Sequence, residues 1–182
     1  MSDQTIPNTS PQATPLPPAR LITTGHTKDG TSVFTSDAVL PPFHPFGPQA
    51  SSFTSFHTTP FLPASNAPNA PPQTLSTSLP RAPAAGTYFC LTDFPPRYKA
   101  PMHRTLSVDY ACVLAGEIVL RLDGGEEKVV GAGEVIVQGG VNHEWVNASD
   151  GFTRVLFVMV GAEAVVLDDG RRLEETVFKK KG

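Results

Sequence analysis

Two polar stretches set in strand-like sequence decide the fold: residues 101–117 read PMHRTLSVDYACVLAGE, and residues 133–147 read GEVIVQGGVNHEWVN. In both stretches apolar and polar residues alternate, and this period of two is typical of β-strands. Side chains two residues apart in a strand share a face. If the strand is unbroken, this spacing predicts one shared face for four polar side chains: His103, Thr105, Ser107 and Asp109.

Further strand-like runs lie on both sides of these stretches. They are rich in Val, Leu, Ile, Phe and Tyr, and turn sequences such as Asp123-Gly124-Gly125 and Asp150-Gly151 separate them. No run of ten or more residues has good helical periodicity. The spacing of about 8–12 residues predicts an all-β sandwich or small barrel. The predicted strands are residues 88–94, 107–114, 117–123, 128–130, 135–138, 143–147 and 153–160.

The first 80 residues have a different composition. They hold 15 of the 19 prolines and only five charged residues, so few side chains there can form a core. We predict a disordered tail over residues 1–18 and an extended segment over residues 19–83. Within that segment, an Asp-Gly turn at 29–30 predicts a hairpin. Five phenylalanines between residues 36 and 83 favour packing on the domain or on a partner subunit; a disordered linker is the alternative.

Charge and hydropathy limit the function classes. The 182 residues carry a net charge of −3, which leaves no general basic field for nucleic acid or anionic lipid. The longest apolar run, residues 155–162, is too short to span a bilayer, and the first residues lack the features of a secretory signal. Two cysteines are too few for a disulfide framework. We therefore expect a reduced, cytoplasmic protein with no nucleic-acid and no membrane partner.

The first polar stretch resembles the first sequence motif of the cupin family. That motif contains Gly, then His-x-His, an acidic residue a few positions later, and a final Gly. Counting back from Gly116, the position of the acid is Asp109. His103 takes the place of the first His, and Thr105 stands in that of the second.

The second polar stretch resembles the second cupin motif, which runs Gly-(Asp/Glu), a turn, then His and a later Asn. The matching positions are Gly133, Glu134, Gly139, His143 and Asn147. The resemblance covers about residues 86–162. The order His-Arg-Thr-x-Ser-x-Asp-Tyr is similar to that of small single-domain cupins of fungi and bacteria, some of which belong to secondary-metabolite pathways.

This resemblance implies a double-stranded β-helix, or jelly-roll barrel, over residues 84–168, followed by a C-terminal tail over residues 169–182. Such an interior is wide enough for one small ligand. His103, Asp109 and His143 are then the predicted catalytic and metal-binding residues, a set that suits one divalent metal, Fe(II) or zinc. The usual family pattern has three His and one Glu, so here one His is missing and the acid is one methylene shorter.

Other readings of these residues stay open. The two histidines and Asp109 form either a metal site or a metal-free polar network. As a further alternative, Asp109 forms a salt bridge with Arg104 or Arg121. A histidine of the N-terminal half is a further candidate ligand if that segment folds over the mouth. Five residues are predicted to line the substrate pocket: Thr105, Ser107, Tyr110, Trp145 and Asn147.

The resemblance implies a small-molecule tailoring enzyme, an oxidoreductase that acts on a polyketide-like or aromatic intermediate in secondary metabolism. Two alternatives remain: a non-redox dehydratase, cyclase or decarboxylase in the same pocket, and a metal-free ligand-binding or assembly module. Cupins are commonly dimers, and an open jelly roll has edge strands that need cover. We therefore expect a homodimer, in which residues 21–24 pair with the sheet of the partner.

Overall fold

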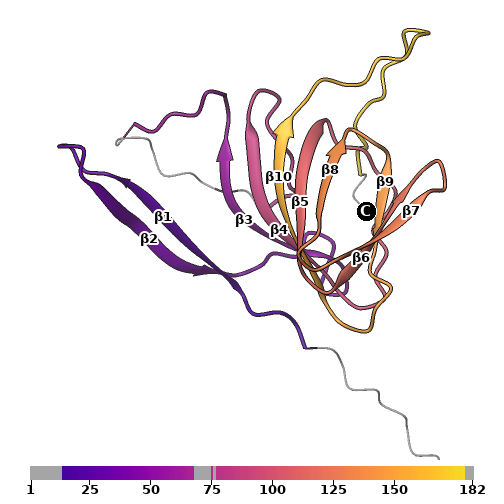
Figure 1. The fold of residues 1–182 in the computed structure, drawn as a ribbon, viewed down its shortest axis with the longest axis horizontal. Coiled ribbons are helices and arrows are strands. Elements are labelled where there is room, and N and C mark those ends of the chain that lie inside the picture. The colour runs from indigo at the N-terminus through magenta and orange to yellow at the C-terminus, as the bar shows by residue number, and fades with distance from the viewer. Residues whose placement is uncertain (1–13, 68–74, 76, 179–182) are drawn as a thin grey trace, which may run out of the picture.

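The computed structural model describes residues 14–67, 75 and 77–178, and within these ranges the regular elements are all β-strands. Ten strands lie in three antiparallel sheets (Figure 1). The all-β class predicted from the sequence is thus confirmed. Of the predicted terminal tails, residues 1–13 and 179–182 lie outside the described ranges.

Two of the sheets enclose the interior of the molecule. The five-stranded sheet has the order β3 (Ser52–Thr59), β4 (Thr87–Phe94), β10 (Thr153–Gly161), β5 (Ser107–Ala115) and β8 (Val135–Gly139). The three-stranded sheet has the order β7 (Glu127–Gly131), β6 (Glu117–Leu122) and β9 (His143–Val146). The chain passes from one sheet to the other between β5 and β6 and again between β8 and β9 (Figure 1). Strands that switch between two packed sheets give the predicted jelly roll.

The strands form because alternate residues are apolar and face the interior. Along β10, Val155, Phe157 and Met159 are buried, while the residues between them are only partly covered. They belong to one core cluster with Val113 of β5 and Ile118 of β6. Burial of such a side chain is worth about 1.5–3 kcal/mol. This inward set therefore holds the two sheets together.

Gly116 connects the two sheets in a single residue between β5 and β6. Its φ is +72°, a backbone angle that favours glycine. A Cβ atom here would lie 2.8 Å from Thr153 Oγ1 and 2.9 Å from Phe152 O, so a side chain has no space. The turn predicted at this position thus ends β5 and starts β6.

The segment before residue 84 contributes a strand to the large sheet. β3 lies beside β4, and the ring centroids of Phe56 and Phe89 are 5.0 Å apart. Ser55 Oγ lies 2.6 Å from the Tyr88 hydroxyl. The domain boundaries drawn from the sequence at residues 18, 83 and 168 stay predictions; residues 52–59 share their sheet with β4.

The hairpin of β1 (Ala19–His26) and β2 (Ser32–Leu40) forms a separate two-stranded sheet. It projects away from the other two sheets (Figure 1). Arg20 and Asp37 join its strands through an ion pair of 2.6 Å on the solvent side. The predicted strand–turn–strand around Asp29-Gly30 is present here, with longer strands than the sequence indicated.

Residues 173–178 turn back onto the sheets. The Leu173 N–H donates to Val165 O at 2.9 Å, and the Thr176 N–H donates to Arg104 O at 3.0 Å. These residues belong to the C-terminal tail predicted over residues 169–182, whose described part forms no helix. Nowhere in the described ranges does the chain form a helix long and apolar enough to cross a membrane.

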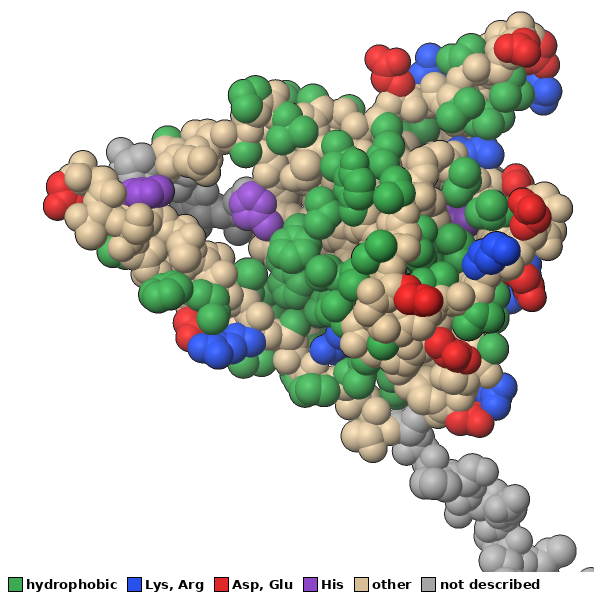
Figure 2. Space-filling model, in the orientation of Figure 1, with side chains coloured by type: hydrophobic (Ala, Val, Ile, Leu, Met, Phe, Trp, Pro, Cys, Tyr) green, Lys and Arg blue, Asp and Glu red, His purple; other side chains and the backbone are tan. Residues whose placement is uncertain are grey.

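Hydrophobic side chains also gather on the outside of the large sheet. Figure 2 shows them over the middle of the molecule, where Figure 1 places β10, β5 and β8. Tyr110 and Leu114 of β5 and Val135 and Val137 of β8 are exposed. The large sheet is therefore apolar on both faces.

Candidate active site

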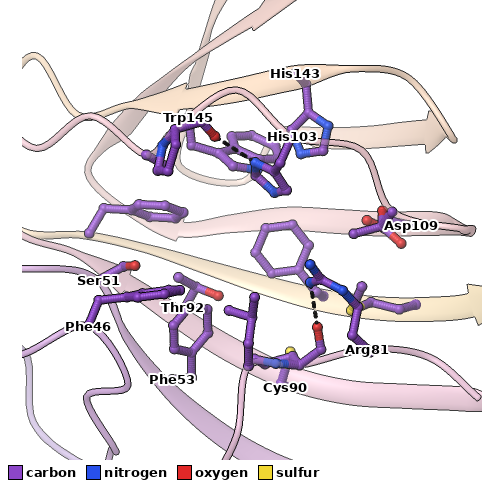
Figure 3. A pocket seen from close by; sticks show the side chains of 18 of the residues that line it. Phe46, Ser51, Phe53, Arg81, Cys90, Thr92, His103, Asp109, His143 and Trp145 are labelled. Carbon is purple, nitrogen blue, oxygen red and sulfur yellow. Dashed lines mark hydrogen bonds between the residues drawn. The ribbon is translucent and has the colours of Figure 1, made fainter. Parts of the chain in front are cut away.

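A cavity of about 270 Å³ lies between the two sheets (Figure 3). Most of its wall is apolar and much of that is aromatic, with Phe46, Phe53, Phe94, Trp145, Phe157 and Phe178. Polar groups reach it from a few positions, among them His103, Asp109 and His143. An apolar cavity with a few converging polar groups is the usual form of a small-molecule site.

The two histidines meet across the junction of the sheets. His103 precedes β5 and His143 opens β9, and each backbone N–H donates to the carbonyl oxygen of the other at 2.8 Å. Their ring centroids lie 4.3 Å apart. Residues forty positions apart are thus brought side by side by one backbone bridge.

Hydrogen bonds fix which ring nitrogen carries the proton. His103 Nδ1 lies 2.8 Å from Pro101 O, and His143 Nδ1 lies 3.0 Å from Val141 O. A carbonyl oxygen only accepts, so Nδ1 donates in both rings and each neutral imidazole has its lone pair on Nε2. His143 Nε2 accepts from the Gln138 side-chain amide at 3.1 Å. His103 Nε2 has no hydrogen-bond partner among the described residues.

Burial keeps both imidazoles neutral. It lowers the pKa of His103, and it lowers the pKa of His143 to about 4, with the neighbouring His103 as the second cause. The charge of Arg81 acts in the same direction on both pKa values. Near neutral pH the cavity therefore holds two uncharged imidazole bases.

Asp109 of β5 is buried at the same cavity. Its Oδ1 lies 2.6 Å from Ser107 Oγ, which lies 3.0 Å from Thr105 Oγ1. Burial raises the pKa of Asp109, and the hydrogen bond from Ser107 offsets part of that rise. The polar face predicted for Thr105, Ser107 and Asp109 is therefore a row of two hydroxyl groups and one carboxyl group.

The ion-pair partners considered for Asp109 are engaged elsewhere. Arg121 pairs with Glu127 at 2.8 Å and with Glu144 at 2.7 Å. Arg104 Nε donates to Gly140 O at 3.0 Å. Asp109 thus meets the cavity without an ion-pair partner among the described residues.

Two predicted pocket residues lie elsewhere. Tyr110 is on the outer face of the large sheet and 53% exposed, because it follows the inward-facing Asp109 in the strand. Asn147 is fully buried, and its Nδ2 faces the carbonyl oxygens of Phe94, Pro95 and Gly151 at 2.8–3.0 Å. Both assignments to the pocket wall are therefore corrected: one residue faces outward, and the other holds loops in place.

The remaining pocket residues lie at or behind the cavity. Thr105 and Trp145 line it, and Ser107 is buried behind Asp109. The Trp145 ring lies edge-on to His143 and to Phe157, with centroid distances of 5.6 Å in both cases. Trp145 thus joins the imidazole pair to the aromatic wall.

The sequence reasoning missed Gln138 and Arg81. Gln138 is the cross-strand neighbour of Asp109 and is buried, and its Oε1 has no hydrogen-bond partner in the described part of the chain. An amide at an inward position of the predicted strand 135–138 was the signal for it. Arg81 lines the cavity from a Pro-rich stretch that has no strand pattern, so no periodicity pointed to it.

As they stand, these side chains do not fit a preformed metal centre. Within the described ranges, no three His, Cys, Asp or Glu side chains are grouped so as to hold an ion. His143 Nε2 and Asp109 Oδ1 already have hydrogen-bond partners. The N-terminal histidines considered as further ligands, His26, His44 and His57, do not line the cavity.

Cys90 also lines the cavity, close to Asp109 in the sheet. Burial raises the pKa of its thiol to about 12. The thiol therefore stays protonated at neutral pH and behaves as part of the apolar wall.

Comparison with known proteins finds relatives for the part of the chain that carries these residues. The family described as "Cupin domain" matches residues 90–159. "Phomopsin biosynthesis cluster protein C'" of Diaporthe leptostromiformis is 42% identical over 84 residues, 46% of this chain and 44% of that protein. "Cupin-domain-containing oxidoreductase srdD" of Neurospora crassa is 33% identical over 93 residues, 50% of this chain and 47% of that protein.

A further relative is "cupin-domain-containing oxidoreductase fogC" of Aspergillus ruber, 35% identical over 92 residues, 49% of this chain and 45% of that protein. The matched segments thus span about half the length of each relative. Among solved structures, an RmlC-like cupin from Shewanella frigidimarina is 13% identical, with a TM-score of 0.44 over 68% of this chain and 85% of that one. The imidazole pair and Asp109 lie within residues 90–159, the part of the chain that matches the cupin domain family.

Proposed function

We propose that this protein is a cytoplasmic small-molecule tailoring enzyme, an oxidoreductase that acts on an aromatic or polyketide-like intermediate of secondary metabolism. The relatives named as cupin-domain oxidoreductases and biosynthesis-cluster proteins support this reading. The observation that carries it is the pair of neutral imidazoles in a cavity lined by aromatic rings. Such a cavity suits a flat, largely apolar molecule that has a hydroxyl or carbonyl group at one end.

The proposed chemistry starts with a proton transfer to His103. His103 lines the cavity and its Nε2 lone pair has no partner in the described residues, so it can accept a proton from a hydroxyl or an acidic carbon of the substrate. Asp109, whose pKa burial raises, can hold and return a proton at a substrate oxygen. The aromatic wall excludes water, which strengthens both contacts.

A non-redox dehydratase, cyclase or decarboxylase is the second candidate. One observation favours it: two neutral imidazoles and a carboxyl group with a raised pKa supply an acid and a base around the same cavity. Elimination or enolisation needs no more than such a pair. A ligand-binding or assembly module is the third candidate.

His103→Ala tests the proposal. We expect turnover of an aromatic or polyketide-like substrate to fall by about 10²–10⁴-fold, the usual contribution of a general base. Product mass separates the first two candidates, because oxidation removes two hydrogens and dehydration removes water. O₂ consumption is followed in the same assay.

The matched control is His57→Ala, a histidine of β3 that is exposed and does not line the cavity. Its turnover should equal that of the wild type. Full turnover in His103→Ala would contradict the assignment of the base. Binding without any turnover in the wild type would favour the third candidate.

A further inference from the structure

A single cation lies at the wall of the cavity. Among the described residues that line it, Arg81 is the only lysine or arginine. Figure 3 shows its guanidinium reaching into the space across from His103 and His143. The positive charge of Arg81 contributes to the lowered pKa values of His103 and His143, and it offsets part of the rise that burial causes in the pKa of Asp109. The guanidinium therefore lies within electrostatic reach of all three side chains.

The hydrogen bonds of Arg81 leave part of the guanidinium available. A guanidinium has five N–H donors. Arg81 Nε lies 2.5 Å from Glu175 Oε1, Nη1 donates to Pro80 O at 3.0 Å, and Nη2 makes a long contact of 3.5 Å to Thr176 O. Two N–H groups therefore have no acceptor in the described part of the chain.

The carboxylate that balances Arg81 lies on its other side. Glu175 lines a second, smaller hollow, and Arg81 forms a wall that this hollow shares with the main cavity. The only carboxyl group among the described residues lining the main cavity is Asp109. Glu175 thus contacts the Arg81 guanidinium from the side away from the main cavity. The guanidinium therefore presents positive charge to the main cavity.

We propose that Arg81 binds a carboxylate of the substrate, so that the substrate is an aromatic or polyketide-like acid. This inference rests on the proposed function, because it names the substrate class of the same cavity. A guanidinium and a carboxylate match as planar forks, and their hydrogen bonds are strong where water is excluded. The apolar body then lies along the aromatic wall, and its far end reaches the imidazole pair.

The C-terminal segment closes this end of the cavity. Phe178 lies with its ring centroid 5.8 Å from that of His103 and 6.0 Å from that of Phe46. It belongs to the same short segment as Glu175 and Thr176, which contact Arg81. The proposed carboxylate site is therefore covered by a segment that Arg81 itself helps to hold.

A binding experiment on the full chain tests the proposal without a known substrate. The probes are 4-butylbenzoate and its uncharged analogue 4-butylbenzamide. The readout is the fluorescence of Trp145, the single tryptophan, which lines the cavity. Hydrogen bonds between two charged groups are stronger than those to a neutral group, so we expect the benzoate to bind about tenfold or more tightly than the benzamide.

Arg81→Gln should remove this preference. The benzoate should lose about tenfold in affinity, while the affinity for the benzamide stays within about twofold. Arg172→Gln is the matched control, because Arg172 pairs with Glu174 on the exposed C-terminal segment and does not line the cavity. Its affinity for both probes should stay at the wild-type value.

Glu175→Gln keeps the proposal falsifiable if Arg81→Gln does not fold. It retains an oxygen that accepts from Arg81 Nε but removes the competing negative charge. The benzoate should bind about threefold or more tightly, with the benzamide unchanged. Glu174→Gln, the exposed neighbour, should change neither affinity.

The outcomes separate this inference from the proposed function. Equal affinity for the two probes, or an effect of Glu175→Gln no larger than that of Glu174→Gln, overturns the carboxylate site. The cavity would then still bind small molecules, and the proposed function would stand. If neither probe changes the Trp145 fluorescence, the carboxylate site is rejected and the small-molecule cavity is challenged with it.

Discussion

The two histidines of the cavity are held differently, although their rings touch. His143 has a hydrogen-bond partner on both ring nitrogens, Val141 O and the Gln138 amide. Among the described residues, the ring of His103 is hydrogen-bonded only through Nδ1, to Pro101 O. The inner imidazole is therefore fixed in orientation, and the outer one keeps its lone pair for a ligand. This division of roles makes His103 the better candidate for the base.

The buried imidazole makes stability depend on pH. The pKa of His143 is about 4 in the folded protein, below the ordinary 6.5, so between these values only the unfolded chain binds the proton. Stability is therefore expected to fall as pH drops from 6.5 to 4, by about 3 kcal/mol for this group alone. Urea denaturation at pH 7, 5.5 and 4.5, followed by tryptophan fluorescence, measures it.

Two other groups modify this dependence. The lowered pKa of His103 adds to the loss in acid, whereas the raised pKa of Asp109 acts in the opposite direction. The control is His143→Gln, which should show a shallower fall over the same range. An equally steep fall in that variant would refute the assignment to His143.

At the scale of residues, the sequence predicted the features that follow from the alternation of side chains between the two faces of a strand. Ser107 and Asp109 face inward because side chains alternate along β5, and the same alternation places Tyr110 outside. His103 lies before β5, and the resemblance to the first cupin motif, rather than an unbroken strand, indicated it. The partner of His143 depends on the register between β5 and β8, which sets Gln138 beside Asp109. Register is a three-dimensional property, and no local pattern in the chain specifies it.

At the scale of elements, the turns position the site as much as the strands do. Gly116 takes the chain from the large sheet into β6, which pairs with β9, the strand that begins with His143. The strands and this turn could be predicted because alternating apolar residues and turn glycines are patterns of the local sequence. The return of residues 173–178 was not, because it depends on contacts with Arg81, Arg104 and Val165.

Gly116→Ala should destabilise the fold strongly. A methyl group would lie 2.8–2.9 Å from Thr153 Oγ1 and Phe152 O, and the φ of +72° is unfavourable for alanine. We expect a loss of about 2–4 kcal/mol, the combined cost of strain and overpacking. Urea denaturation gives the value.

Gly124→Ala serves as its control, because a Cβ at Gly124 would meet nothing within 4 Å. Its stability should remain within about 0.5 kcal/mol of the wild type. Equal stability of the two variants would show that the β5–β6 turn relaxes around a side chain.

At the scale of the whole molecule, two apolar surfaces are left exposed by the described part of the chain. The projecting hairpin exposes Phe34 (79%) and Val39 (62%), and an isolated hairpin is marginally stable in water. The outer face of β5 and β8 exposes Val135 (75%) and Val137 (71%). We propose a homodimer in which the hairpin of each chain packs on its partner.

The variant Phe34→Glu with Val39→Lys tests this assembly. We expect the dimer to weaken by about tenfold or more, because two apolar contacts are lost and charge is placed against an apolar surface. Sedimentation velocity over a concentration series measures the change. Phe61→Glu, an exposed phenylalanine outside the hairpin, should leave the association unchanged. A wild-type chain that is monomeric throughout the series would disprove the proposal.

The reciprocal hydrogen bonds between His103 and His143 have a consequence for how the site is lost. They form an isolated bridge, and the next hydrogen bond between the same two segments, from Ala100 N–H to Trp145 O, lies a few residues away. Local opening there separates the rings while the sheets on either side remain intact. Deuterium uptake at these two amides should therefore record the disassembly of the site before any global melting, and heat should end catalysis at a lower temperature than it ends the fold.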